Sequence, residues 1–229
     1  KLQTGADKVN IVAHSMGGLL TKEYLRQTSA TSTIDKIIFV GTPHLGAPKA
    51  GKLLLYGDDL DINFVGLGLN PLEAKKIAQN MPAVYELLPS QKYFSISGGY
   101  IIDARSSAQS GSAVLSFNET KNFLSAASLN PALLARGDAF HQSIDNLVFP
   151  SSIKTYNIVG CGNTDTIGRI VMFDRGKYNL VYTLGDKTVP LESAVAVGSQ
   201  NKLYYSNAKH TNLVKDIGAL NRISAILNN

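Results

Sequence analysis

The sequence predicts an α/β fold in which helices flank a mostly parallel β-sheet. Short runs rich in β-branched and apolar residues predict four parallel strands, at about residues 9, 37, 155 and 202. The run that ends at Val40 is almost wholly apolar, which is typical of a strand buried on both faces of a parallel sheet. Within the first 40 residues, a strand, a helix and a strand form one βαβ unit, which is right-handed by default.

The composition is that of an ordinary globular domain. The chain has 229 residues, of which 44% are hydrophobic and 17% charged, so it can bury a sizeable core and is not expected to be disordered. The formal net charge is only +5 and no basic stripe is present, so we expect no nucleic-acid partner. Cys161 is the only cysteine, which excludes an internal disulfide and a thiolate metal cluster. No apolar run is long enough to span a bilayer.

A serine stands between the first predicted strand and the first predicted helix. The strand covers about 9–13, the helix covers about 16–26, and the pattern between them is Ala13-x-Ser15-x-Gly17. Small residues two positions before and after the serine would let the helix start lie against the strand end, with the hydroxyl at the tip of a sharp turn. The pattern therefore predicts Ser15 as a nucleophile. An ordinary βα turn with a capping serine is the alternative.

A loop rich in glycine and proline, 41–48, follows the second predicted strand at about 34–40. It is expected at the carboxyl edge of the sheet, where open parallel sheets bind their ligands. His44 is a candidate for the base, but it follows the serine by only one βαβ unit, so we prefer to interpret it as a residue that packs this loop. His14 is also interpreted as structural, because we expect it to face away from the tip of the turn.

The regular alternation of strands and helices is lost in residues 51–150, which we predict to form a helical cap or lid. The predicted catalytic core is then made of residues 1–50 and 151–229. Helices are predicted in the insertion at about 72–79, 118–127 and 131–147. Apolar side chains that look exposed in the sequence are Tyr56, Phe64, Val65, Leu67 and Leu69. A helical subdomain that has its own core and takes no part in binding is the alternative.

The last eighty or so residues return to strands. The predicted elements are a strand at about 153–159, a hairpin-like pair at 167–173 and 178–182, a strand at 202–206 and a helix at 213–227. A glycine-led turn that contains Asp186 follows the hairpin, and His210 comes shortly after the last strand.

Ser15, Asp186 and His210 each lie just beyond a predicted strand. Because parallel strands present their carboxyl ends at one edge of the sheet, we expect these residues to converge. A neighbouring imidazole can take the proton of a serine hydroxyl during attack. A carboxylate can orient that imidazole and stabilise its cation. The backbone N–H of Met16 is predicted as one oxyanion donor, and the order Ser, Asp, His is that of the α/β-hydrolases.

Two other carboxylates compete for the role of the acid, Asp165 and Asp174. We prefer Asp186 because a glycine precedes it and because the strand that follows it ends near His210. His210 is the one histidine of four that follows the last predicted strand. The alternative for it is a surface histidine at a helix start.

Five motifs in one order resemble the lecithin:cholesterol acyltransferase-like lipases and phospholipases. They are AHSMGG at 13–18, GTPHLGAP at 41–48, MP…LLPS at 81–90, GDKTVP at 185–190, and HTNL at 210–213 with a helix after it. The resemblance covers most of the chain. It implies an α/β-hydrolase fold, a cap over the pocket and an extracytoplasmic or secreted protein. It also implies that Ser15, Asp186 and His210 are the nucleophile, acid and base, although Ala13 replaces the first glycine of the family's elbow.

Proteins of this family have several strands and an oxyanion loop before the elbow. Few residues precede the elbow here, so we expect the N-terminal half of the sheet to be absent from this chain. An N-terminal portion of the same protein is expected to complete the sheet and to supply the second oxyanion donor. Loss of one such donor typically slows an enzyme about a hundred- to thousand-fold.

The resemblance and the motifs together predict a serine-dependent hydrolase or acyltransferase that acts on lipid esters through an acyl-enzyme. Contact of the cap with a membrane or lipid surface is a further expectation. A thioesterase or non-lipid carboxylesterase on the same fold, or an inactive binding module, are the alternatives. We expect no cofactor and no metal, because Asp59, Asp61 and Asn63 have the spacing of a calcium loop but lack its glycine and its final acidic ligand.

Overall fold

The computed structural model describes residues 3–28, 30–57, 70–108, 113–197 and 202–229. Two predicted features therefore lie outside the described residues: the calcium-like segment 59–63 and the apolar residues at 64–69. The chain divides into two compact units. The core unit consists of Lys1–His44, Ser143–Thr166 and Leu184–Asn229, and the insertion unit of Leu45–Gln142 and Ile167–Thr183.

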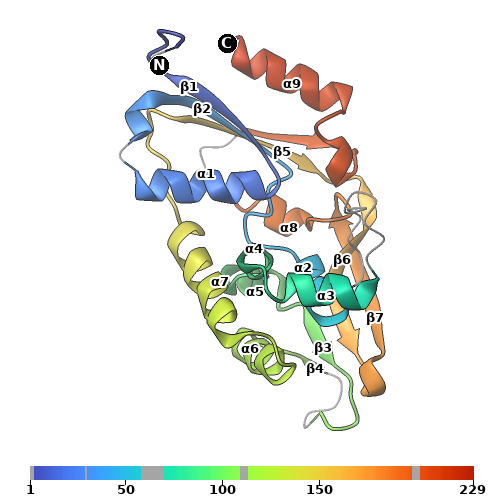
Figure 1. The fold of residues 1–229 in the computed structure, drawn as a ribbon. Helices are drawn as coiled ribbons and strands as arrows, with labels where there is room; N and C mark the ends of the chain where they lie inside the picture. The colour runs from blue at the N-terminus through green and yellow to red at the C-terminus, as the bar shows by residue number, and fades with distance from the viewer. Residues whose placement is uncertain (1–2, 29, 58–69, 109–112, 198–201) are drawn as a thin grey trace. The chain divides into compact units, whose positions relative to one another are not determined.

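A four-stranded parallel sheet organises the core unit (Figure 1). Its strands, in spatial order, are β1 (Val9–His14), β2 (Ile34–Val40), β5 (Lys154–Gly160) and β8 (Lys202–Ser206). Each neighbouring pair is parallel, with Ile38 of β2 opposite Val12 of β1 and opposite Tyr156 of β5. The predicted mostly parallel sheet is confirmed in these four strands.

Both faces of β2 are buried, which explains its unbroken apolar sequence. Ile37 and Phe39 point into a cluster that contains Leu25 of α1 (Met16–Gln27). Ile38 and Val40 point into a second cluster, which contains residues of α9 (Ile217–Leu227). Successive residues of a strand face opposite sides, so α1 and α9 cover opposite faces of the sheet. The remaining short helices of this unit are η1 (Ala30–Thr33), α8 (Leu191–Ala194) and η3 (His210–Asn212).

The strand β1 forms one edge of the described sheet. Val9 and Val12 are exposed on it, and the neighbouring helix α1 exposes Met16, Leu20 and Tyr24 at a spacing of four residues. Met16, Leu20 and Tyr24 form one apolar stripe along the helix, because residues four apart share a helix face. The expectation that further strands complete the sheet at this edge stays a prediction.

The insertion unit combines helices with a second four-stranded sheet. Its helices are α2 (Pro48–Tyr56), α3 (Pro71–Ala78), α4 (Pro82–Tyr85), α5 (Gln91–Ser97), α6 (Phe117–Ala126), α7 (Pro131–Ile144) and the short η2 (Asp174–Gly176). Its strands, in spatial order, are β4 (Ala113–Val114), β3 (Ile101–Asp103), β6 (Asn163–Met172) and β7 (Tyr178–Gly185). The strand β3 pairs parallel to β6 and antiparallel to β4. Helix α7 and strands β6 and β7 each contain a point along the chain at which one unit ends and the other begins.

Local sequence signals fix the starts of the helices in the insertion unit. Asn70 and Glu73 form a capping box at α3, in which the side-chain oxygen of each accepts the backbone N–H of the other at 3.0 and 3.1 Å. Ser116 and Glu119 form the same motif at α6. At α7, the side chain of Asn130 accepts the N–H two residues further on, at 2.9 Å. These caps occur where the sequence predicted helices.

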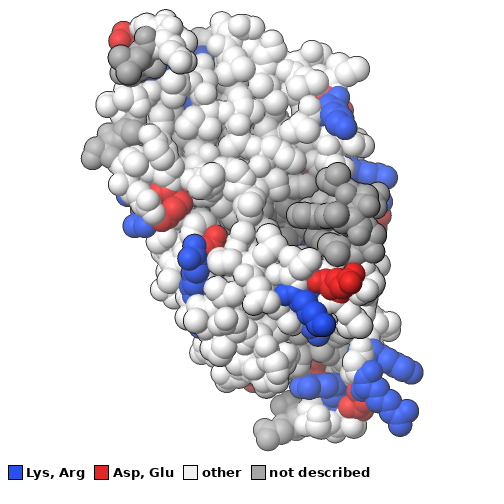
Figure 2. Space-filling view, in the orientation of Figure 1, with Lys and Arg blue, Asp and Glu red and all other residues white. Residues whose placement is uncertain are grey.

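Two surface properties bear on possible partners. On the face drawn in Figure 2, lysine and arginine side chains are scattered, except at the lower right, where several gather beside acidic ones. Among the described residues, no helix is both long enough and apolar enough to cross a membrane.

His44 lies at the start of the loop after β2 and is fully buried. Its ring and that of Phe39 pack in a T-shaped arrangement, with 5.0 Å between the ring centroids and 80° between the ring planes. Burial lowers the pKa of His44 well below its ordinary value, and the nearby charge of Lys22 acts in the same direction. His44 is therefore neutral inside the fold.

We expect Phe39→Ala to lower the free energy of unfolding by about 3–5 kcal/mol, because it empties a fully buried site between the rings of His44 and Phe149. Val148→Ala is the control: its side chain is 84% exposed, and the change should stay within about 0.5 kcal/mol. Urea denaturation followed by circular dichroism measures both. A similar loss in the two variants would contradict this account of the core.

The neutral state of His44 predicts that the fold weakens in mild acid. The unfolded chain binds a proton at His44 near pH 6.5, whereas the folded chain binds it only at lower pH. Below about pH 6.5 the unfolded state thus holds more protons than the folded state. The free energy of unfolding therefore decreases as the pH is lowered, by up to about 1.4 kcal/mol per pH unit. His44→Gln should flatten this slope in urea denaturation curves recorded across the range. An unchanged slope would show that another group causes it.

Candidate active site

Ser15 occupies a sharp turn between β1 and α1. Its backbone has φ 54° and ψ −130°, a conformation that residues other than glycine rarely adopt and that costs about 1–3 kcal/mol. The N–H of Ser15 donates to the carbonyl oxygen of Val40 at 2.9 Å, so the end of β2 holds the turn in place. This strand, strained turn and helix have the form of a nucleophile elbow.

The small residue that the elbow requires is Gly18 rather than Gly17. A Cβ atom on Gly18 would lie 2.1 Å from the side-chain oxygen of Thr42, so α1 approaches the loop after β2 too closely for any side chain there. A Cβ on Gly17 would meet nothing within 4 Å. The expectation that residue 17 must be small to avoid a collision is therefore wrong. Ala13 is buried, and its methyl group belongs to the core beside β2.

Asp186 lies in the turn that follows β7 and is completely buried. Its Oδ1 accepts the backbone N–H groups of Thr188 and Val189, at 3.0 and 2.7 Å. The turn is closed by Lys187, which has φ 76° and donates its N–H to the side chain of Thr166 at 2.8 Å. The carboxyl group is thus held in one orientation, with Oδ2 left to bind another group.

His210 links this carboxyl group to the serine. Its Nδ1 lies 2.7 Å from Oδ2 of Asp186, and its Nε2 lies 2.8 Å from Oγ of Ser15. A carboxylate only accepts hydrogen bonds, so Nδ1 carries the proton and Nε2 accepts from the serine hydroxyl. The backbone N–H of His210 also donates to the carbonyl oxygen of Asp186, at 2.8 Å. The structure brings together the three residues that the sequence singled out, and all three belong to the core unit.

Two glycines make room for the Asp186–His210 pair, and sequence reasoning missed their role. Gly41, directly after β2, has φ 58°, and a Cβ on it would lie 3.3 Å from both Oδ2 of Asp186 and Nδ1 of His210. The same atom would lie 2.7 Å from the side chain of Leu213. A Cβ on Gly160, the last residue of β5, would lie 2.4 Å from Cβ of Asp186. A glycine at the carboxyl end of two neighbouring strands was the available signal.

The two competing carboxylates are engaged elsewhere. Asp165 is paired with the ammonium group of Lys187, whose hydrogen bond lowers the pKa of this carboxyl. Asp174 lies in the insertion unit, where it accepts the backbone N–H of Ser106 at 3.1 Å.

Met16, the predicted oxyanion donor, is the first residue of α1. The N–H groups in the first turn of a helix have no acceptor within the helix, so this N–H can be offered to a ligand beside the serine. Among the described residues, no group of three or more His, Cys, Asp or Glu side chains is placed to hold a metal ion.

The orientation of His14 differs from the expectation. Its ring does not face away from the site, since its centroid lies 4.9 Å from that of His210. Its Nε2 lies 3.2 Å from the carbonyl oxygen of His210. Sequence reasoning had no signal for this contact, because His210 is distant in the chain.

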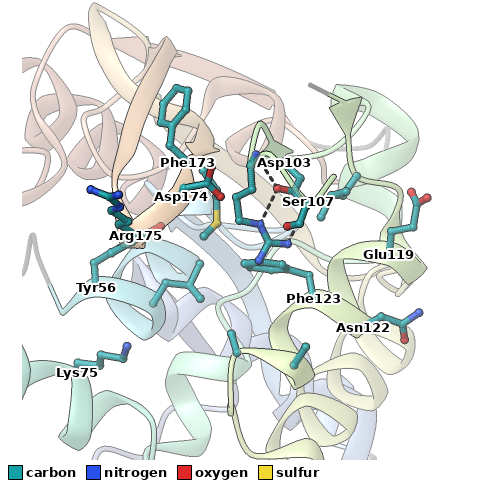
Figure 3. Close-up of a pocket in the computed structure, with 17 residues that line it drawn as sticks. Tyr56, Lys75, Asp103, Ser107, Glu119, Asn122, Phe123, Phe173, Asp174 and Arg175 are labelled. Atoms are coloured by element: carbon teal, nitrogen blue, oxygen red, sulfur yellow. Dashed lines mark hydrogen bonds and ion pairs between the residues drawn. The ribbon is translucent and has the colours of Figure 1, made fainter. Parts of the chain in front are cut away.

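The insertion unit contains a cavity of about 720 Å³, shown in Figure 3. Among the lining residues, Arg105 binds both carboxylate oxygens of Asp103, at 2.8 and 2.7 Å, and lies over the ring of Phe123 at 5.0 Å. The lining does not include Ser15 or His210. The ion pair between Arg105 and Asp103 is satisfied within the protein.

The fold of this chain resembles that of solved structures. The crystal structure of the Tle4–Tli4 complex contains a similar fold, with a TM-score of 0.69 and 15% identity over 95% of this chain and 58% of that chain. This chain thus spans 58% of the length of that neighbour. The lipase BlEst2 of Bacillus licheniformis, in its mature form, aligns with a TM-score of 0.49 and 16% identity over 98% of this chain and 67% of the other. The comparison with curated proteins gives no match.

The family model of lecithin:cholesterol acyltransferase matches residues 1–214, which is most of the chain. This match supports, in general terms, an enzyme of the ester-hydrolase or acyltransferase type. The chain therefore has the α/β-hydrolase fold and belongs to the lecithin:cholesterol acyltransferase family.

Proposed function

We propose that this chain carries the catalytic triad of a serine-dependent hydrolase or acyltransferase that acts on lipid esters. The observation that supports it is the hydrogen-bonded series from Ser15 through His210 to Asp186, with distances of 2.8 and 2.7 Å. The family to which the chain belongs supports a lipid ester as the substrate.

In the proposed reaction, Oγ of Ser15 attacks the carbonyl carbon of the ester while its proton passes to Nε2 of His210. The carbonyl oxygen becomes an oxyanion, to which Met16 donates its backbone N–H. The C–O bond to the alcohol then breaks, and the alcohol leaves with the proton from His210. The acyl group remains on Ser15. Water or a second alcohol attacks this acyl-enzyme by the same steps in reverse, which makes the enzyme a hydrolase or an acyltransferase.

The surroundings of Asp186 suit its role in this scheme. The side chain is buried, and Oδ1 is already occupied by two backbone N–H groups, so Oδ2 is directed at His210. A fixed carboxylate keeps the proton on Nδ1 of the neutral imidazole and stabilises the imidazolium that forms on attack. Neither effect requires the carboxylate to become protonated.

Three predicted features remain proposals beside the triad. Residues 51–150 act as a cap, the cap makes contact with a membrane or lipid surface, and an N-terminal portion of the same protein completes the sheet and adds the second oxyanion donor. The exposed apolar side chains on β1 and α1 support the last of these.

The first test labels the nucleophile. A fluorophosphonate probe should react with Ser15, and mass spectrometry of tryptic peptides should find the adduct on that residue alone. Ser15→Ala should abolish labelling, whereas Ser95→Ala, which changes an exposed serine of α5, should leave it unchanged. An adduct on another serine would overturn the assignment. Complete absence of labelling would favour an inactive binding module.

The second test concerns the acid. Asp186→Asn should lower kcat/KM for ester hydrolysis about 10⁴-fold, because the amide presents N–H to Nδ1 of His210 and favours the wrong tautomer. The melting temperature should change little, since the side-chain oxygen of asparagine can still accept the two N–H groups of the turn. Asp165→Asn, at an exposed carboxylate, is the matched control and should retain activity. If that control is the inactive one, Asp165 is the acid.

A further inference from the structure

We propose that His14 is a positioning residue that holds His210 against Ser15. The inference rests on the proposed function, in which His210 is the general base. His14 immediately precedes the nucleophile and contacts the base, so one residue at the end of β1 links the two groups between which the proton moves.

The contact has two parts. The first is a hydrogen bond of 3.2 Å between Nε2 of His14 and the backbone carbonyl oxygen of His210. A carbonyl oxygen only accepts, so Nε2 of His14 is the donor, which fixes its tautomer. The second is a ring contact, with centroids 4.9 Å apart and planes inclined by 36°. His14 therefore restrains both the main chain and the imidazole of His210.

His210 needs such a restraint because it does not lie within a strand or a long helix. It begins the short helix η3, in the connection between β8 and α9. Its backbone N–H is held by the carbonyl oxygen of Asp186, at 2.8 Å. The carbonyl oxygen of the same residue accepts two bonds, from Nε2 of His14 at 3.2 Å and from the backbone N–H of Leu213 at 3.3 Å. Both backbone polar groups of His210 are thus held, and the ring of His14 adds a contact to the imidazole itself.

The electrostatic environment is consistent with a neutral His14. Its pKa is lowered mainly by partial burial, and next by the neighbouring imidazole of His210, while the hydrogen bond to the backbone of His210 and then the carboxylate of Asp186 act in the opposite direction. A neutral ring can remain beside the imidazolium that forms on His210 during attack, whereas a second cation at this distance would oppose its formation. His14 can therefore keep its hydrogen bond throughout the reaction.

The experiment separates the two parts of the contact in the full-length protein. His14→Phe keeps a ring but removes the donor, and His14→Gln keeps an N–H donor near the position of Nε2 but removes the ring. His141 supplies the matched control, because its Nε2 likewise lies 3.0 Å from a backbone carbonyl, that of Glu86 in the insertion unit, although His141 is buried and His14 only half-buried. The measurements are kcat and KM for a nitrophenyl ester, the rate of fluorophosphonate labelling at Ser15, and the melting temperature.

We expect His14→Phe to lower kcat and the labelling rate about 10- to 100-fold with little change in KM, because a small displacement of the base has effects of this size. His14→Gln should recover much of the loss. His141→Phe should lower the melting temperature without changing kcat. If His14→Phe retains full kcat, or if His141→Phe loses as much, the inference is wrong. If the unaltered protein is not labelled at Ser15, the proposed function fails first and the inference fails with it.

Discussion

The paired hydrogen bonds between Asp186 and His210 determine most of what surrounds them. One joins the side chains and the other joins the main chains, so the turn after β7 and the start of η3 are fixed to each other at two points. Any side chain on Gly41 or Gly160 would press on this pair. The carboxyl ends of β2 and β5 thus carry glycines because two loops cross them at close range, and the position of the imidazole relative to Ser15 follows from that crossing.

Much of the architecture could be predicted from the sequence because its signals are local. Such signals determine the structure only of residues a few positions away in the chain. Examples are the β-branched runs at 34–40 and 153–159 and the capping residues Asn70 and Ser116. The same is true of the elbow, where strand, serine and helix are contiguous. The sequence also selected Ser15, Asp186 and His210 from their places after strands, and the structure brings them within hydrogen-bonding distance. Their catalytic roles stay predictions.

The features that could not be predicted depend on partners far away in the chain. The strands β3 and β4 are three and two residues long, too short to show a periodic pattern, and β3 is fixed by its pairing with β6. Gly18 must lack a side chain because it packs closely against Thr42, which lies in the loop after β2. His14 turns toward His210 because of a backbone carbonyl almost two hundred residues later. In each case the contact is made with an atom of a distant segment, and neither the hydrophobic pattern nor the helix and strand propensities of a sequence indicate such contacts.

The discontinuous make-up of the core unit has a consequence for how the chain folds. Lys36 of β2 pairs with Lys154 of β5, and β8 joins β5 only after most of the chain is present. The entropy lost on closing a loop rises with its length, and sheets built from distant segments form slowly. If the insertion collapses first, the effective loop between β2 and β5 becomes much shorter. The order in which the two units form would then control how quickly the sheet, and with it the serine–histidine contact, is assembled.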